Sequence, residues 1–157
     1  MPSSFIADCT LLQALEAHST LVPCCCDVVL FRQGEMSTGI FIVRSGSASL
    51  LMKAENGVEV AHITVTAGSI LGLPAIVSKE PYTLSAMANK GSEVSFVELE
   101  AFEGVMQEQP SLLPKVLEVL AAEVRSARLA LTELLEKLHH EPCQAEARRK
   151  MHWARPA

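Results

Sequence analysis

The chain has 157 residues, of which 49% are hydrophobic and 20% are charged, and its mean hydropathy is +0.26. This composition excludes a disordered chain, because disordered chains are poor in hydrophobic residues and rich in net charge. The length predicts one domain, or one domain with a long helical extension. Since so small a protein has a limited interior, the apolar surplus predicts an additional interface with a partner.

The net charge of −5 is unevenly distributed along the chain. The last ten residues contain four basic residues and no acid, so residues 1–147 hold nine basic and eighteen acidic residues, a net charge of −9. An acidic body does not attract nucleic acid through its long-range field, so we expect no direct nucleic-acid binding. We also expect a cytoplasmic protein without membrane contact, because no targeting segment precedes the domain and glycine and proline interrupt the uncharged run 60–78.

The first twenty residues have a small apolar helical face and predict a helix that Asp8 or Thr10 caps. Six of the eight glycines then lie between residues 34 and 72, where they separate short β-rich runs. This spacing predicts an antiparallel sandwich or barrel. The pair Asn56-Gly57 predicts a hairpin turn. The expected strands are residues 28–31, 40–43, 47–52, 58–65, 83–88 and 93–98.

Two helices are predicted after the strands, a short one over residues 99–108 and a long one from a cap at Ser111 to His139 or His140. Apolar residues recur along the long helix at alternating spacings of three and four, which is the heptad pattern of self-associating helices. The alternative is that this stripe packs on the chain's own sheet, as its first part can do with Val116 and Val119. We predict a homodimer through the seam Leu117, Leu120, Val124, Ala127, Leu131, Leu134 and Leu138.

Four motifs in the chain resemble the cyclic-nucleotide-binding domain of the Crp–Fnr transcription regulators. They are LFRQGE at 30–35, GIFIVRSG at 39–46, AGSILGLPA at 67–75 and PYTLSA at 81–86. The resemblance implies a mainly β fold with flanking helices, a double-stranded β-helix (jelly-roll-like) sandwich with a long C-terminal dimerisation helix. The expected parts are an N-terminal helix and β-roll at 1–110, the dimerisation helix at 111–140 and a flexible basic tail at 141–157.

The resemblance also implies where a ligand would bind. In family members that bind cyclic AMP or GMP, the phosphate-binding cassette begins Phe-Gly-Glu and ends in Arg-Ser or Arg-Thr. Here Gly72 keeps the glycine, but Leu73 stands where the glutamate belongs and Tyr82 where the arginine belongs. Thr83 retains the hydroxyl. Losing two charge-assisted contacts costs on the order of 3–6 kcal/mol, so we expect weak or absent cyclic-nucleotide binding and no cofactor.

Two states of this pocket remain open from the sequence. It either holds another small-molecule effector, an anion or a more apolar ligand, or it is filled by Leu73 and Tyr82. On the long helix, Ala127 and Arg128 align with the hydroxyl pair that contacts the purine in the bacterial activator. The candidate ligand-binding residues are therefore Leu71, Gly72, Leu73, Pro74, Ala75, Tyr82, Thr83 and Arg128.

The function expected from these features is a non-enzymatic sensory or regulatory module for signal transduction in transcription regulation. We expect no DNA-binding domain, because 17 residues after His140 are too few for a helix-turn-helix domain. One alternative is a ligand-free dimeric interaction protein that heterodimerises with a full-length regulator. A weaker alternative is a redox sensor using Cys24, Cys25 and Cys26, or a haem sensor in which one of the histidines and a cysteine bind the haem. The sequence contains no motif for catalytic residues and no Cys-x-x-Cys pair, so neither an active site nor a metal site is expected.

Overall fold

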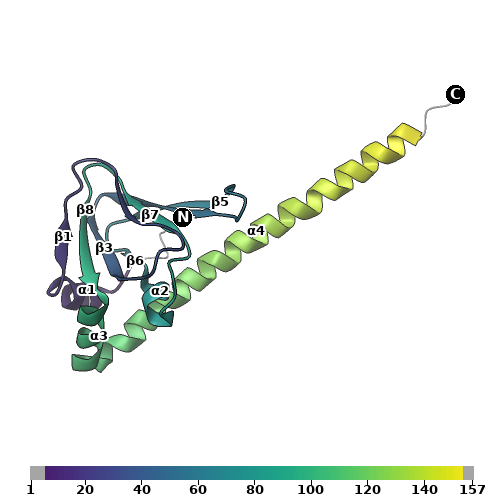
Figure 1. The fold of residues 1–157 in the computed structure, drawn as a ribbon. Coiled ribbons are helices and arrows are strands. Elements are labelled where there is room, and N and C mark those ends of the chain that lie inside the picture. Colours follow the sequence, from purple (N-terminus) through teal and green to yellow (C-terminus); the bar gives the residue numbers. More distant parts are fainter. Residues whose placement is uncertain (1–5, 154–157) are drawn as a thin grey trace. The chain divides into compact units, whose positions relative to one another are not determined.

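The computed structural model describes residues 6–153, and of residues 127, 130 and 139–153 it describes the backbone alone. The chain divides into two units, one ending at Glu123 and one beginning at Val124, and each is described by itself. The first unit contains all the strands (Figure 1).

Two four-stranded antiparallel sheets form the first unit. In spatial order, one contains β1 (Thr20–Val22), β8 (Glu93–Glu98), β3 (Gly39–Ser45) and β6 (Ile70–Leu71). The other contains β2 (Val28–Phe31), β7 (Ser85–Ala88), β4 (Ser47–Lys53) and β5 (Glu59–Thr66). The predicted β-sandwich is therefore confirmed. Strands β1 and β6 were not predicted, because three and two residues are too few to show an alternating pattern.

The hairpin between β4 and β5 turns at the predicted Asn-Gly pair. Gly57 has a φ of +83°, a conformation that glycine adopts without steric cost. The side-chain oxygen of Asn56 accepts a hydrogen bond from the Val58 N–H at 3.0 Å. The two strands then pair from Lys53 opposite Glu59 to Ser47 opposite Thr66.

Four α-helices accompany the sheets in the described residues: α1 (Cys9–Glu16), α2 (Leu73–Ser78), α3 (Leu99–Glu108) and α4 (Leu113–Trp153). Asp8 caps α1 as predicted, since its carboxylate accepts a hydrogen bond from the Thr10 N–H at 2.8 Å. The helix expected over the first twenty residues was too long, because α1 ends at Glu16 and the chain enters β1 at Thr20.

Helix α4 differs from its prediction at both ends. It begins at Leu113, because Pro110–Leu112 form a 3₁₀ turn in place of a first α-helical turn capped by Ser111. It continues to Trp153, past the predicted end at His139 or His140, so the segment expected to be a flexible tail is helical as far as Trp153. That segment is rich in alanine, glutamate, arginine and lysine, which favour helix. Residues 154–157 of the predicted tail lie outside the described part.

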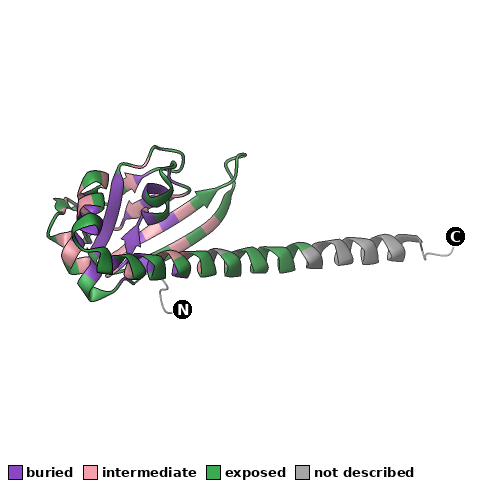
Figure 2. Cartoon of the chain, turned by 90° about the horizontal axis from the view of Figure 1, so that it is seen from below, coloured by how far each residue is buried: buried purple, intermediate pink, exposed green. Residues whose placement is uncertain are grey.

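The core of the first unit consists of two apolar clusters. One lies between the β1-β8-β3-β6 sheet and α1, α3 and the first turns of α4. Val116 and Val119 are buried there, so the first part of the apolar stripe packs on the chain's own core, which was the alternative to self-association. The other lies between the two sheets. Figure 2 shows the buried residues gathered on the strands and the inner helix faces. The second cluster includes Phe31, Phe41, Val43, Leu50, Val65, Leu71, Tyr82 and Val94.

Within the described residues, no helix has the length and apolar character needed to cross a membrane.

Candidate functional site

The predicted cassette follows β6 and forms the short helix α2. Gly72 caps this helix with a φ of +85°. Proline at the start of α2 suits a helix N-terminus, because the missing N–H would have no partner there. The helix ends at Ser78, and the capping residue Lys79 also has a left-handed conformation, with a φ of 58°.

Tyr82 occupies the place of the family's arginine and is buried, with 4% of its surface exposed. Its hydroxyl donates a hydrogen bond to the Gly39 carbonyl oxygen at 2.8 Å. The hydroxyl oxygen of Tyr82 in turn accepts from the backbone N–H groups of Thr38 at 3.2 Å and Gly39 at 3.4 Å. The phenol is thus satisfied by the chain's own backbone, and its polar tip does not need a ligand.

The ring and backbone of Tyr82 are held by the LFRQGE motif. The ring stacks on Phe31 with centroids 4.0 Å apart and an angle of 18° between the planes. The Tyr82 N–H donates to the Glu35 carbonyl at 2.9 Å, and the Gly34 N–H donates to the Tyr82 carbonyl at 2.8 Å. A turn more than forty residues away in sequence therefore fixes this side chain. Nothing in the sequence alone indicated that Phe31 and Gly39 belong to the cassette.

Gly72 and Tyr82 pack closely enough to depend on each other. A Cβ atom built at Gly72 would lie 2.9 Å from Tyr82 Cε1 and 3.4 Å from the Gly39 carbonyl oxygen. Contacts below 3.0 Å force neighbouring atoms to move, so only glycine fits here without a shift of the ring. Glycine is therefore required twice, by the left-handed φ and by the aromatic ring beside it.

Leu73, in the place of the family's glutamate, is fully buried. It lies in the cluster beneath the helices, with Ile76, whereas Leu71, Ala75 and Tyr82 lie in the cluster between the sheets. Neighbouring cassette residues thus enter two different cores. A buried leucine cannot accept a hydrogen bond from a ribose hydroxyl, and a carboxylate at this position would lose its hydration.

Of the eight predicted ligand-binding residues, the structure brings Leu71, Ala75 and Tyr82 together in the cluster between the sheets, with Gly72 against the Tyr82 ring, whereas Leu73 is buried in the other cluster. Pro74 and Thr83 are exposed, so neither side chain is buried in either cluster. Arg128 is exposed on the part of α4 that belongs to the second unit, and its role in ligand binding stays a prediction.

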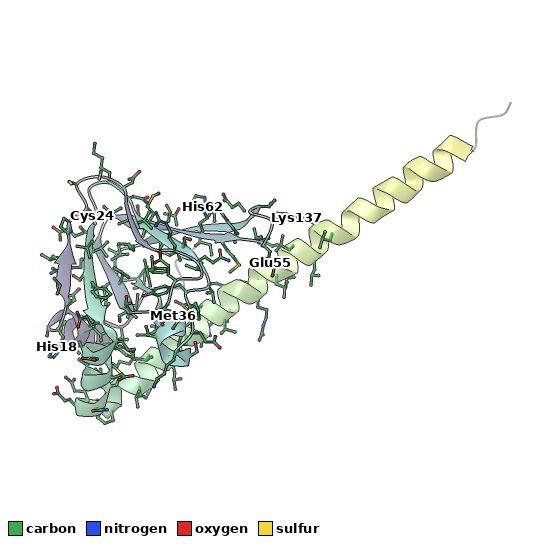
Figure 3. All side chains as sticks on the ribbon, viewed as in Figure 1. His18, Cys24, Met36, Glu55, His62 and Lys137 are labelled. Atoms are coloured by element: carbon green, nitrogen blue, oxygen red, sulfur yellow. The ribbon has the colours of Figure 1, made fainter. Side chains whose placement is uncertain are left out.

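The cysteine triplet lies at another part of the first unit, after β1 (Figure 3). The Cys24 thiol donates to the Val22 carbonyl at 3.3 Å, and burial raises its pKa, which disfavours the reactive thiolate. Cys25 and Cys26 are exposed free thiols. Cys24 lines a shallow hollow of about 350 Å³ with Leu21, Val22, Pro23, Gly91, Ser92 and Glu93.

No group of three potential metal ligands occurs among the described residues. His18 follows α1 and His62 lies on β5, and Figure 3 shows them in separate places. His139 and His140 fall among the residues whose side chains are outside the description. The haem and redox alternatives stay untested predictions.

The predicted dimer seam is largely exposed in the single chain. Leu117 is 63% exposed and Leu131 is 57% exposed, and Val124, Leu134 and Leu138 are also accessible. Leu120 is the exception, since it packs partly against the core of the first unit. The side chain of Ala127 lies outside the description. Large apolar side chains in such a row are typical of a surface that another helix covers.

Two antiparallel sheets, a short helix after a left-handed glycine and a long C-terminal helix define a β-roll domain. The model of the cyclic nucleotide-binding domain matches residues 23–109. The chain therefore belongs to the cyclic nucleotide-binding domain family. This confirms the family predicted from the four motifs.

Solved structures with this fold include the catabolite activator protein of Thermus thermophilus. It is 19% identical, with a TM-score of 0.69 over 81% of this chain and 60% of that one. The c-di-GMP responsive regulator CLP of Xanthomonas campestris is 16% identical, with a TM-score of 0.69 over 92% of this chain and 71% of that one. The sensor domain of the regulator DNR from Pseudomonas aeruginosa is 22% identical, with a TM-score of 0.59 over 75% and 79% of the two chains. The chain thus spans about 60% of the length of the Thermus protein. Among curated protein sequences, none matches the chain.

Proposed function

We propose that this chain is a non-enzymatic regulatory module whose cassette is closed by its own Leu73 and Tyr82, and which acts as a dimer without cyclic AMP or cyclic GMP as effector. The observation that carries the proposal is the bonding of Tyr82. Its hydroxyl bonds to the backbone of Thr38 and Gly39, where the family's arginine would neutralise a phosphate.

The chemistry of the cassette supports this proposal. Residues 71–76 and Tyr82 contain no charged side chain, so nothing there balances the charge of a cyclic phosphate. Binding an anion in a region this buried without a counter-charge costs several kcal/mol. Displacing Tyr82 would in addition break its hydrogen bonds and its stacking on Phe31. Both costs disfavour nucleotide binding, and neither arises in the folded domain without a ligand.

Calorimetric titration with cyclic AMP, cyclic GMP and c-di-GMP tests the closed cassette. The dinucleotide belongs in the series because a protein of the same fold is described as responsive to it. We expect no binding at micromolar concentration for any of the three nucleotides. Low-micromolar affinity for either cyclic mononucleotide at ordinary salt would overturn the proposal. Tight binding of c-di-GMP alone would show that the cassette is not closed and that the dinucleotide is the effector.

The exposed apolar row on α4 supports dimerisation as the working state. Leu117, Val124 and Leu131 lie seven residues apart and are all exposed. Burying such residues against a second helix contributes roughly 1.5–3 kcal/mol for each large side chain. Light scattering at micromolar concentration is expected to give twice the chain mass, and a monomer would contradict this part of the proposal.

The same row supports a second candidate function, an interaction protein that shares its helix with a full-length regulator. We do not assign nucleic-acid contact to this chain itself, because residues 1–147 carry a net charge of −9. Mixing the chain with a regulator of the same family and measuring heterodimer mass by native mass spectrometry distinguishes the two candidates. Heterodimers would favour the interaction protein, and unmixed homodimers would favour the separate module.

A further inference from the structure

Two cysteines of the triplet are neighbours on a surface bend of the first unit. Cys25 and Cys26 are exposed free thiols, and the chain bends at both residues between the end of β1 and the start of β2. In an extended strand, neighbouring side chains point to opposite faces of the sheet. A bend removes this constraint, so both sulfurs can reach one bound atom. The absence of a Cys-x-x-Cys pair from the sequence did not indicate this.

The bend is held in place on both sides. On one side, the buried Cys24 donates its thiol hydrogen to the Val22 carbonyl oxygen at 3.3 Å, and its own carbonyl oxygen accepts from the Gly91 N–H at 3.3 Å. On the other side, the Asp27 carboxylate accepts from the Lys90 N–H at 2.7 Å. Two of these contacts join the bend to the turn between β7 and β8. The two exposed thiols are therefore presented by a fixed backbone, which needs little ordering when a ligand binds.

The exposed pair is poorly suited to a disulfide bond with itself. Neighbouring Cα atoms across a trans peptide are ~3.8 Å apart, whereas the two Cα atoms of a disulfide are usually about 4.4–6.8 Å apart. An ion bound between the two sulfurs lets them stay farther apart than an S–S bond of about 2.05 Å, and it closes a larger, less strained ring. Two neighbouring thiols therefore suit a bridging ion better than they suit each other.

The number of donors determines which ion fits. No group of three histidine, cysteine, aspartate or glutamate side chains able to hold a metal occurs in the described part of the chain. Structural zinc sites take four ligands and iron–sulfur clusters take four cysteines, so a site with two sulfurs suits neither. Thiolates are soft ligands and select Cu(I), whose coordination two sulfurs in line can complete. Calcium and magnesium ions prefer oxygen ligands.

We infer that Cys25 and Cys26 together form a surface site for the soft monovalent cation Cu(I), which both sulfurs bind. Binding forms two copper–sulfur bonds and releases the two thiol protons to water, while the oxidation states of copper and sulfur do not change. The buried thiol of Cys24 is not a ligand, because it already bonds to the backbone. The site needs neither the closed cassette nor the dimer of the proposed function.

Competition with the Cu(I) chelator bicinchoninate tests the site on the full chain, reduced and without oxygen. The starting protein carries Cys9→Ser and Cys143→Ser, so that thiols outside the triplet do not contribute. We expect one Cu(I) for each chain. Cys25→Ser and Cys26→Ser should each weaken binding at least about a hundredfold, because changes outside a ligand shell already cost about 10–100-fold. The matched control Cys24→Ala should stay within about threefold of the starting protein.

Three outcomes would overturn the two-sulfur site, with circular dichroism showing that each variant is folded. One is a Cys25→Ser or Cys26→Ser variant that binds Cu(I) as tightly as the starting protein. Another is a Cys24→Ala variant that binds as weakly as the serine variants. The third needs no variant of the triplet: X-ray absorption of the loaded chain should show two sulfur neighbours for each copper, and three would contradict the site.

Stoichiometry and a second metal complete the test. Native mass spectrometry distinguishes one ion in each chain, which we expect, from one ion shared by two chains, which would contradict a site built by a single bend. Zn(II) should not bind at micromolar concentration, because the site offers two of the four ligands that zinc takes. Tight Zn(II) binding that Cys25→Ser abolishes would show that the site has more donors and is not a Cu(I) site.

Discussion

The Tyr82 hydroxyl donates a hydrogen bond to the Gly39 carbonyl oxygen at 2.8 Å, and in the proposed function this contact keeps the cassette closed. It joins the segment after α2 to the first residue of β3, so the cassette is held to the neighbouring sheet from within. The bond has a neutral donor and a neutral acceptor. It therefore contributes to the stability of the fold.

Removing this hydroxyl should weaken the domain without opening it. We expect Tyr82→Phe to lower the free energy of unfolding by about 1 kcal/mol, because the hydrogen bonds are lost while the stacking on Phe31 remains. Urea denaturation measures the change. Thr83→Val alters the exposed neighbouring hydroxyl and should stay within about 0.5 kcal/mol of wild type. Equal effects of the two substitutions would show that the Tyr82 hydroxyl has no special role.

Gly72 offers a sharper test of the packing. Gly72→Ala adds a Cβ only 2.9 Å from Tyr82 Cε1 at a residue with a φ of +85°, so we expect a loss of about 1–3 kcal/mol in the free energy of unfolding. The control is Gly104→Ala in α3, where an added Cβ meets no atom within 4 Å. That substitution should stabilise the chain by up to about 1 kcal/mol, since alanine favours helix. A neutral Gly72→Ala would mean that Tyr82 is not held beside it.

Restoring the family's charges should recover some nucleotide binding at a cost in stability. We expect Leu73→Glu with Tyr82→Arg to bind cyclic AMP at least about tenfold more tightly than wild type, because a charge-assisted contact contributes about 1.5–3 kcal/mol. Leu73 is fully buried, so the new carboxylate also lowers the melting temperature of the unliganded variant. Thermal unfolding with and without cyclic AMP reads both effects. A folded double variant with no gain in affinity would show that the cassette backbone has also diverged.

The apolar row on α4 predicts that a single charged side chain introduced into it prevents dimerisation. Leu131→Glu places a carboxylate at the centre of the seam and should change the mass in light scattering from dimer to monomer. Thr132→Glu introduces the same side chain at the next residue, which is exposed and outside the seam, and should leave the dimer intact. A dimer that survives Leu131→Glu would place the interface elsewhere.

The ion pair between Asp8 and Lys115 predicts that the stability of the fold depends on pH in the acidic range. Lys115 Nζ lies 2.7 Å from Asp8 Oδ1, and this contact, followed by the Thr10 N–H, lowers the pKa of the Asp8 carboxyl from 3.8 to about 2. Because the folded-state pKa is the lower one, the stabilisation is complete above about pH 4 and is lost as the pH falls towards 2. Lys115→Met should reduce this loss in denaturation measured across that range, whereas Lys90→Met should not. Identical acid profiles for the two variants would contradict this role of the ion pair.

The local and periodic features of this protein could be predicted from its sequence. The Asn56-Gly57 turn, the Asp8 cap and the heptad row of α4 depend on residues close together in the chain, so their patterns are visible without a fold. The missing charges of the cassette were also visible in the sequence, because the family motif can be compared with this chain position by position. The sequence alone therefore predicted the family and its departure from the family's ligand site.

Only the tertiary structure decided what replaces the missing charges. Tyr82 is held by Phe31, Glu35 and Gly39, which lie more than forty residues earlier, and no periodicity relates such distant positions. The short strands β1 and β6 likewise form only because longer strands pair with them. From the sequence, an open pocket and a filled one were both consistent with Leu73 and Tyr82. The folded chain buries both side chains. Burial of their apolar surface and the hydrogen bonds of the Tyr82 hydroxyl stabilise the same arrangement.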